Sequence, residues 1–183
     1  MEKKLTLIRH DDMDFRLDLT QYQAIHEEFI KAGLVETAVL QFTHDNRLVN
    51  IPQEIVDYMN SSPNWDFAIH GWDHAHYDEF LSDIIVRDIA AAMHFCEELF
   101  HKRPTIWSTP WNCRSGGMEQ AAKVLGITID NESYDIARFI REVKTGTYEG
   151  HSVYFHGWKN DEMLQFPEML ELAKEVWYET PKI

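Results

Sequence analysis

The sequence is short of positive charge and of cysteine, and it contains no long hydrophobic run. Its 183 residues include 17 Lys and Arg against 31 Asp and Glu, which gives a net charge of −14. An acidic surface repels phosphate groups, so we expect no nucleic-acid partner and no basic helix lying on a membrane. Because no run of about 18 apolar residues is present, we also expect no transmembrane helix.

Only two cysteines are present, Cys96 and Cys113. Two thiols cannot build a disulfide framework or a thiolate zinc site, so we expect both to be free. The first residues also lack an apolar segment that ends in a small-residue cleavage site. The sequence therefore predicts a cytoplasmic protein, whereas it leaves the oligomeric state open.

Strand and helix patterns alternate along the chain, without an internal repeat or a low-complexity tract. The expected strands are Lys4–Arg9, Val35–Phe42, Trp65–His70, Thr105–Ser108, Ile127–Ile129 and Ser152–His156. The expected helices are Gln21–Ala32, Pro52–Met59, Glu79–Lys102, Gly117–Leu125 and Pro167–Tyr178, while Tyr134–Val143 is ambiguous. This alternation predicts one α/β domain over residues 1–183, with helices outside a parallel sheet that forms either a barrel or an open layer. The lack of Gly-x-Gly-x-x-Gly and Gly-Lys-Ser/Thr motifs counts against nucleotide binding.

Ten histidines and six tryptophans suggest a site built from imidazole and aromatic rings. Many of them, together with acidic residues, directly follow the expected strands. The stretches in question are Arg9–Asp14, His70–His76, Ser108–Asn112, Asp130–Glu132 and His156–Trp158. Because the carboxyl ends of parallel strands lie on one face, where active sites form, we expect these stretches to converge.

Asp11 and Asp12 are adjacent carboxylates, which repel each other unless a cation neutralises one of them; an N-cap pair before a helix is the alternative. His70 and His74 are four residues apart, so both rings can reach one metal ion. Adding Asp12 gives two imidazoles and one carboxylate and leaves coordination positions open, as in a catalytic zinc site. This donor set favours Zn²⁺, and Co²⁺, Ni²⁺ or Fe²⁺ would also fit.

Three tryptophans, Trp72, Trp111 and Trp158, lie in the same loops. Their flat faces suit the apolar C–H faces of sugar rings, but they could equally fill the mouth of a small barrel. His156 ends an apolar strand and precedes Gly-Trp, as His70 does. We interpret six further histidines as surface, core or substrate-rim groups; they are His10, His26, His44, His94, His101 and His151.

In this order, these residues resemble the polysaccharide deacetylase family, the family-four carbohydrate esterases, from about Leu7 to Trp158. The family motifs are a strand ending in two aspartates, a His-x-x-x-His pair, a proline–aromatic loop, an aspartate, and an apolar strand ending in histidine. Their counterparts here are Ile8–Asp12, His70–His74, Thr109–Asn112, either Asp130 or Asp135, and His156. The resemblance implies a distorted (β/α) barrel with about seven parallel strands and helices outside.

The resemblance also implies a reaction and a role for each residue. Asp12, His70 and His74 would bind one divalent metal ion, Asp11 would be the general base and His156 the general acid. The implied reaction removes an acetyl group from an N-acetylated (or O-acetylated) carbohydrate by hydrolysis. The residues expected to contact the sugar are Trp72, Pro110, Trp111 and Trp158.

The chain departs from the family at the third motif, which normally begins with an arginine that holds the base aspartate. Here the stretch reads Trp107-Ser108-Thr109-Pro110, so Arg9 or Arg114 would have to take the place of that arginine. We expect Arg9 and Asp130 as supporting residues. The aspartate that orients His156 stays open.

Two other functions remain under consideration. A carbohydrate-binding or structural protein on the same fold, with a weakened site, is consistent with the missing arginine. An iron oxygenase with two histidines and one carboxylate is suggested by His76-x-Asp78 followed later by His156. That chemistry usually occupies an antiparallel jelly roll, which the alternation of strands and helices does not favour.

Overall fold

The computed structural model describes residues 5–44 and 47–176. Seven parallel strands form one curled sheet in the order β7-β6-β5-β2-β1-β9-β8. They are β1 (Ile8–Met13), β2 (Glu36–Gln41), β5 (Trp65–Gly71), β6 (Ile106–Ser108), β7 (Thr128–Asp130), β8 (Ser133–Asp135) and β9 (Ser152–Phe155). The short strands β3 (Thr43–His44) and β4 (Arg47–Leu48) pair separately in an antiparallel ribbon.

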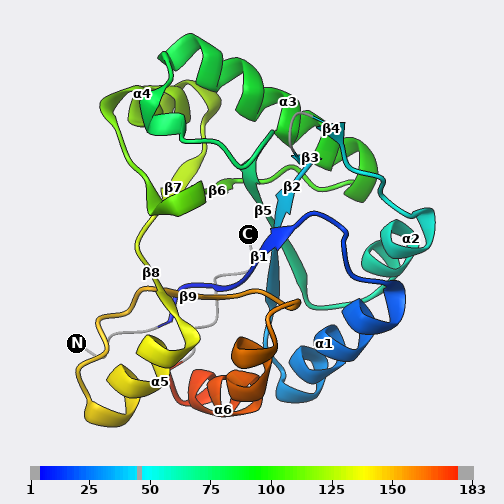
Figure 1. The fold of residues 1–183 in the computed structure, drawn as a ribbon, viewed down its shortest axis with the longest axis vertical. Helices are drawn as coiled ribbons and strands as arrows, with labels where there is room; N and C mark the ends of the chain where they lie inside the picture. The colour runs from blue at the N-terminus through cyan, green and yellow to red at the C-terminus, as the bar shows by residue number, and fades with distance from the viewer. Residues whose placement is uncertain (1–4, 45–46, 177–183) are drawn as a thin grey trace.

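Six α-helices in the described residues form a layer outside the strands (Figure 1). They are α1 (Leu19–Ala32), α2 (Gln53–Ser61), α3 (Ser82–Phe100), α4 (Gly116–Leu125), α5 (Ile136–Thr145) and α6 (Asn160–Val176). α1 begins with a capping box between Asp18 and Gln21 and ends at Gly33, whose φ of 69° is the left-handed conformation that glycine adopts most readily. None of these helices is both long and apolar enough to cross a membrane. The seven parallel strands, curled and covered by helices, confirm the predicted distorted β/α barrel in the form of a half-barrel.

The two edge strands of the half-barrel, β7 and β8, are separated in sequence only by Asn131 and Glu132. Figure 1 shows this segment running from one edge of the sheet to the other. It pairs first with β6 and then with β9, so it crosses the open side of the half-barrel. Asp130 lies at this crossing, which brings it close to the ends of both halves of the sheet.

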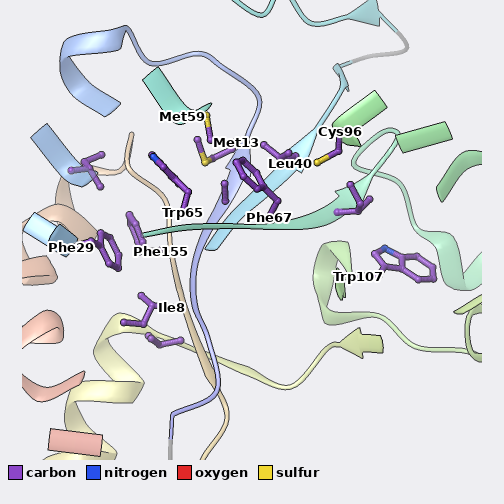
Figure 2. Close-up of a cluster of buried hydrophobic side chains, with 14 of the residues drawn as sticks. Ile8, Met13, Phe29, Leu40, Met59, Trp65, Phe67, Cys96, Trp107 and Phe155 are labelled. Atoms are coloured by element: carbon purple, nitrogen blue, oxygen red, sulfur yellow. The ribbon is translucent and has the colours of Figure 1, made fainter. Parts of the chain in front are cut away.

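The core lies between the sheet and the helices and is rich in aromatic rings (Figure 2). Phe29 of α1 packs beside Phe155 of β9, with 5.9 Å between ring centroids. Met59 of α2 and Cys96 of α3 are buried in the same core. All six residues of β2 are buried, because one face meets helices and the other faces the inside of the half-barrel.

The expected elements differ from the observed ones mainly at their ends. The first strand runs past the two aspartates to Met13, since an irregular register lets it continue; its expected start at Lys4 lies outside the described residues. The long helix begins at Ser82 rather than Glu79, because Tyr77–Glu79 forms a separate 3₁₀ turn. The ambiguous segment 134–143 holds the end of β8 and most of α5. The last helix begins at Asn160, so Pro167 lies inside it, and its expected end at Tyr178 is not among the described residues.

Candidate active site

The carboxyl end of β1 turns two neighbouring carboxylates in different directions. Its pairing with β2 shifts register between His10 and Met13, and Asp12 has a φ of 54°, which is uncommon for a residue with a side chain. As a result Asp11 reaches Arg9, whereas Asp12 reaches His70 at the end of β5 and His74 in the loop after it. Backbone strain of this kind concentrates at functional sites.

Asp12, His70 and His74 form a compact group of possible metal ligands. The Nε2 atoms of both histidines lie 3.2 Å from the same oxygen, Oδ1 of Asp12. The Nδ1–H of His70 donates to the Ser108 carbonyl oxygen at 2.7 Å, which leaves Nε2 of the neutral ring with a free lone pair. Within the described chain, Oδ1 of Asp12 is buried and has no hydrogen-bond partner. Lone pairs that face one another in this way fit a shared cation.

The charge state of Asp12 agrees with this arrangement. Burial disfavours its charged form, but His70 and His74, in the protonated state in which they carry positive charge and donate to the carboxylate, outweigh burial and hold the pKa of Asp12 well below its ordinary value. The carboxylate is therefore ionised and available as a ligand at neutral pH.

The loop between His70 and His74 is shaped by Gly71 and Tyr77. A Cβ atom at Gly71 would lie 2.5 Å from the Asp73 carbonyl oxygen, so only glycine fits this turn. The buried Tyr77 hydroxyl accepts the backbone N–H of Trp72 at 2.9 Å and that of Asp73 at 3.3 Å. Burial raises the pKa of Tyr77 to about 12, so its hydroxyl stays neutral and fixes the backbone that carries His74.

Arg9 holds Asp11 from two residues away on the same strand. Its Nε donates to Oδ1 at 3.0 Å and its Nη2 to Oδ2 at 2.6 Å, while Nη1 donates to Asp130 at 3.1 Å. Burial raises the pKa of Asp130, although the charge of Arg9 opposes this. The other candidate, Arg114, pairs with Glu119 at the surface. Arg9 is therefore the arginine beside the predicted base, and Asp130 supports Arg9 rather than His156.

His156 is oriented by a residue that the sequence analysis missed, Glu162 in the first turn of α6. Glu162 accepts the His156 backbone N–H at 2.6 Å, and both its carboxylate oxygens lie 3.0 Å from Nδ1 of the ring. Nζ of Lys159 lies 3.0 Å from the same nitrogen. Burial opposes ionisation of Glu162, but His156 outweighs it, so the pKa of Glu162 is lowered. An acidic residue in the helical turn after a histidine-bearing strand is the signal that could have identified it.

The metal-ligand candidates, the base candidate and the acid candidate line one cavity of about 340 Å³ at the carboxyl ends of the strands. Its lining residues are Arg9, Asp11, Asp12, His70, His74, Thr109, Trp111, Asn112, Tyr154, His156, Trp158 and Lys159. Nε2 of His156 lies 3.6 Å from Oδ2 of Asp12, so the acid candidate and the metal ligands face the same space.

Two of the four predicted sugar contacts lie at this cavity. Trp111 has a φ of 59° and is 63% exposed, with its indole stacked on His76 at 5.3 Å between ring centroids. Trp158 is 38% exposed and is covered on one face by the guanidinium of Arg16 at 4.7 Å. Both indoles leave apolar surface for a ligand.

The other two predicted sugar contacts, Trp72 and Pro110, do not line the cavity. The Trp72 ring packs against Phe42 and Phe95, each 6.1 Å away, because the turn at Gly71 directs it toward the core. Pro110 is buried under the loop that presents Trp111. Asp135, the alternative fourth-motif aspartate, caps α5 by accepting the Arg138 backbone N–H. Trp72, Pro110 and Asp135 therefore contact other parts of the protein and not the cavity.

The iron-oxygenase alternative loses its basis in this structure. Its chemistry usually occupies an antiparallel jelly roll, whereas the main sheet here is parallel throughout. His76 and Asp78 pair with each other near the surface, 3.7 Å apart, and neither lines the cavity with His156.

Solved structures with a similar fold include members of carbohydrate esterase family 4. The chain resembles a family 4 carbohydrate esterase from Streptomyces lividans in complex with acetate, with a TM-score of 0.72 at 13% identity over 96% of this chain and 90% of that one. A pseudoenzyme of the same family from Bacillus anthracis gives 0.72 at 14% identity over 97% and 62%. A family 4 acetyl xylan esterase from Clostridium thermocellum, in complex with a cobalt ion, gives 0.65 at 15% identity over 93% and 82%.

Sequence comparison gives two further findings. A search of curated proteins returns no match. The model of the polysaccharide deacetylase family matches residues 11–129, which hold the paired aspartates, the two metal-site histidines and the Pro-Trp loop. The chain belongs to the polysaccharide deacetylase family.

Proposed function

We propose that this protein is a metal-dependent hydrolase that removes an acetyl group from an N-acetylated (or O-acetylated) carbohydrate. One observation carries the proposal: a carboxylate–imidazole group suited to a cation shares one cavity with a second carboxylate and a third histidine. Those are the parts that acyl hydrolysis needs, namely a Lewis acid, a base and an acid.

Asp12, His70 and His74 would hold one divalent ion. Two imidazoles and one carboxylate favour Zn²⁺, while Co²⁺, Ni²⁺ and Fe²⁺ also suit this donor set. When bound, the ion supplies polarisation of the acetyl carbonyl and a lower pKa for water. The unpartnered Oδ1 of Asp12 is the feature of this chain that fits such an ion.

Asp11 serves as the general base. Arg9 donates one hydrogen bond to each of its oxygens and so fixes the plane of the carboxylate. A carboxylate has about four lone-pair sites, so Asp11 still has room to accept a proton from the attacking water. Asp130 anchors the third nitrogen of Arg9, which stiffens the support.

His156 serves as the general acid. Glu162 occupies the Nδ1 side of its ring, so the Nε2–H of the imidazolium points into the cavity. From there it donates a proton to the leaving amine or alcohol. Glu162 and Lys159 both contact Nδ1, so they set the ring's orientation and its charge balance.

The substrate is an acetylated sugar that packs against Trp111 and Trp158. Their exposed indoles suit the apolar faces of sugar rings. The net charge of −14 favours a neutral or cationic ligand over a polyanion. Because the Streptomyces lividans esterase was solved with acetate, the product expected here has a precedent on this fold.

The test is release of acetate from acetylated amino-sugar oligomers and acetylated xylan by protein loaded with Zn²⁺ or Co²⁺. We expect turnover by the wild type and none by His70→Ala. The second candidate is a carbohydrate-binding protein without turnover, which the likeness to a pseudoenzyme favours. Binding of the same oligomers without acetate release, by metal-loaded protein, would establish the second candidate.

A further inference from the structure

A second group of one carboxylate and two histidines is buried beneath the cavity. Glu36 of β2, His10 of β1 and His26 of α1 are each at most 1% exposed. Oε1 of Glu36 lies 2.7 Å from Nδ1 of His10, and Oε2 lies 2.8 Å from Nδ1 of His26. None of the three lines the cavity, so the proposed chemistry does not use them directly.

The hydrogen bonds of His26 require both of its ring protons. Its Nδ1 faces the Glu36 carboxylate, and its Nε2 lies 2.8 Å from the Pro63 carbonyl oxygen. When Glu36 is a carboxylate, both neighbours are acceptors, so both nitrogens donate and the ring is an imidazolium. Its plane lies 3.9 Å above the Trp65 ring at an angle of 8°, which suits a cation on an aromatic face. His26 therefore supplies the positive charge that a buried Glu36 needs.

The hydrogen bonds of His10 fix the opposite state. The backbone N–H of Gly157 donates to Nε2 of His10 at 3.2 Å, so this nitrogen carries no proton. The single proton is then on Nδ1 and is donated to Glu36. A Cβ atom at Gly157 would lie 2.6 Å from Nε2 of His10, so glycine is required for this approach. Gly157 directly follows His156, and His10 directly precedes Asp11.

We propose that Glu36, with His26 as its counter-ion, is a positioning residue for His156. It holds His10 in the one tautomer that accepts the Gly157 N–H, and this bond ties the backbone of the acid candidate to the strand of the base candidate. Replacement of Glu36 removes that tie while leaving Asp12, His70 and His74 in place. The inference rests on the proposed role of His156.

The protonation states are tested first, on the metal-loaded wild-type protein, by ¹⁵N–¹H NMR of histidine-labelled samples at neutral pH. We expect His26 to carry protons on both nitrogens and His10 to carry one on Nδ1 alone. A single proton on His26, or a proton on Nε2 of His10, would overturn the inference. This measurement requires no substrate, so its failure is distinct from failure of the proposed function.

The positioning role is tested with Glu36→Met, and Phe100→Leu is the matched control. Phe100 stacks on Phe67 at 4.7 Å between β5 and α3, so its replacement weakens packing away from the network. In Glu36→Met, whose side chain cannot accept the His10 Nδ1–H, we expect hydrogen exchange at the Gly157 amide to rise at least about tenfold and kcat to fall about 10- to 100-fold, with KM and metal content unchanged. Phe100→Leu should change neither Gly157 exchange nor kcat by that amount.

Equal Gly157 exchange in the two variants would contradict the positioning role, and so would a wild-type kcat in Glu36→Met. His10→Phe is the second variant, because it keeps the ring that stacks on Phe155 at 4.5 Å but cannot accept the Gly157 N–H. We expect it to reproduce the faster Gly157 exchange and the lower kcat. Unchanged exchange in folded His10→Phe would equally overturn the inference.

Discussion

β1 contributes one residue to each of two clusters of the same composition, one carboxylate and two histidines. The clusters differ in how the imidazole nitrogens approach the carboxylate oxygens. In Asp12–His70–His74, both imidazoles approach a single oxygen that has no hydrogen-bond partner. In Glu36–His10–His26, each carboxylate oxygen has its own imidazole at 2.7 or 2.8 Å. Residue type does not distinguish the clusters, whereas the direction of each donor and acceptor does.

The Asp12 cluster is arranged to take a ligand, whereas the Glu36 cluster already has a hydrogen-bond partner for each carboxylate oxygen. The Glu36 cluster satisfies its polar atoms internally and is closed to solvent, as stable buried networks are. The Asp12 cluster is 17% exposed at its carboxylate, opens into a cavity and leaves one acceptor unsatisfied. A cation would complete the Asp12 cluster, whereas the Glu36 cluster has no open position for one.

The largest expected effect is that of metal removal on activity. Dialysis against a chelator should abolish acetate release, because a bound metal ion contributes several kcal/mol to the transition state and each 1.36 kcal/mol is tenfold in rate. Zn²⁺ or Co²⁺ should restore it. Full activity of chelator-treated protein that elemental analysis shows to be metal-free would mean that the Asp12 cluster has no more need of a cation than the Glu36 cluster.

Replacement of the acid candidate comes next. His156→Gln should lower kcat by about 10²- to 10⁴-fold, the usual contribution of a general acid, while metal content stays as in the wild type. Steady-state kinetics with metal-loaded protein measures this. Should metal be lost together with activity, His156 would belong to the ligand group instead.

Arg9→Met should lower the free energy of unfolding by about 3–5 kcal/mol, because it leaves the buried Asp11 carboxylate without its partner. Urea denaturation of the metal-free proteins measures this. Arg114→Met is the control, since Arg114 forms a surface pair that contributes at most about 1 kcal/mol. Equal losses in the two variants would contradict the assignment of Arg9.

A smaller effect is expected at the rim of the cavity. Trp111→Ala should raise KM for an acetylated oligosaccharide about 2- to 10-fold, since stacking on an aromatic face is worth about 0.5–1.5 kcal/mol. Stability should stay within about 0.5 kcal/mol, because the side chain is mostly exposed. Trp72→Phe is the control and should leave KM unchanged; a rise there would return Trp72 to the sugar contacts.

The smallest expected effect is the pH dependence of stability that Glu162 contributes. Because its folded pKa lies below its ordinary value of 4.5, its stabilisation is fully present above that pH and is lost as pH falls through the lowered folded pKa. Between about pH 5 and about pH 3, Glu162→Gln should lose less free energy of unfolding than the wild type. If urea denaturation shows the same loss of unfolding free energy in both proteins, the Glu162 carboxylate gains no stabilisation from His156.

Much of the fold and part of the site could be predicted because the information was local. Alternating strand and helix patterns indicated the parallel sheet, and the position of Asp12, His70 and His156 at strand ends placed them on one face. Arg9 could also have been chosen over Arg114, since residues two apart on a strand share a face, as Arg9 and Asp11 do.

The remaining features depended on tertiary geometry. Glu162 reaches His156 only through the turn that starts α6, and Trp72 is directed inward only by the crowding at Gly71. The Glu36 network joins residues 10, 26, 36 and 157, which only the packing of α1 against the sheet brings together. No sequence spacing encodes the approaches within the Glu36 network.

Metal content per chain tests the central contrast most directly, by elemental analysis of the wild type, His70→Ala and Glu36→Gln after incubation with Zn²⁺ or Co²⁺. We predict about one equivalent in the wild type and in Glu36→Gln, and none in His70→Ala, because two imidazoles and a carboxylate make the site and the buried network has no part in it. A wild type that binds no metal under these conditions, or a His70→Ala variant that keeps it, would contradict the account.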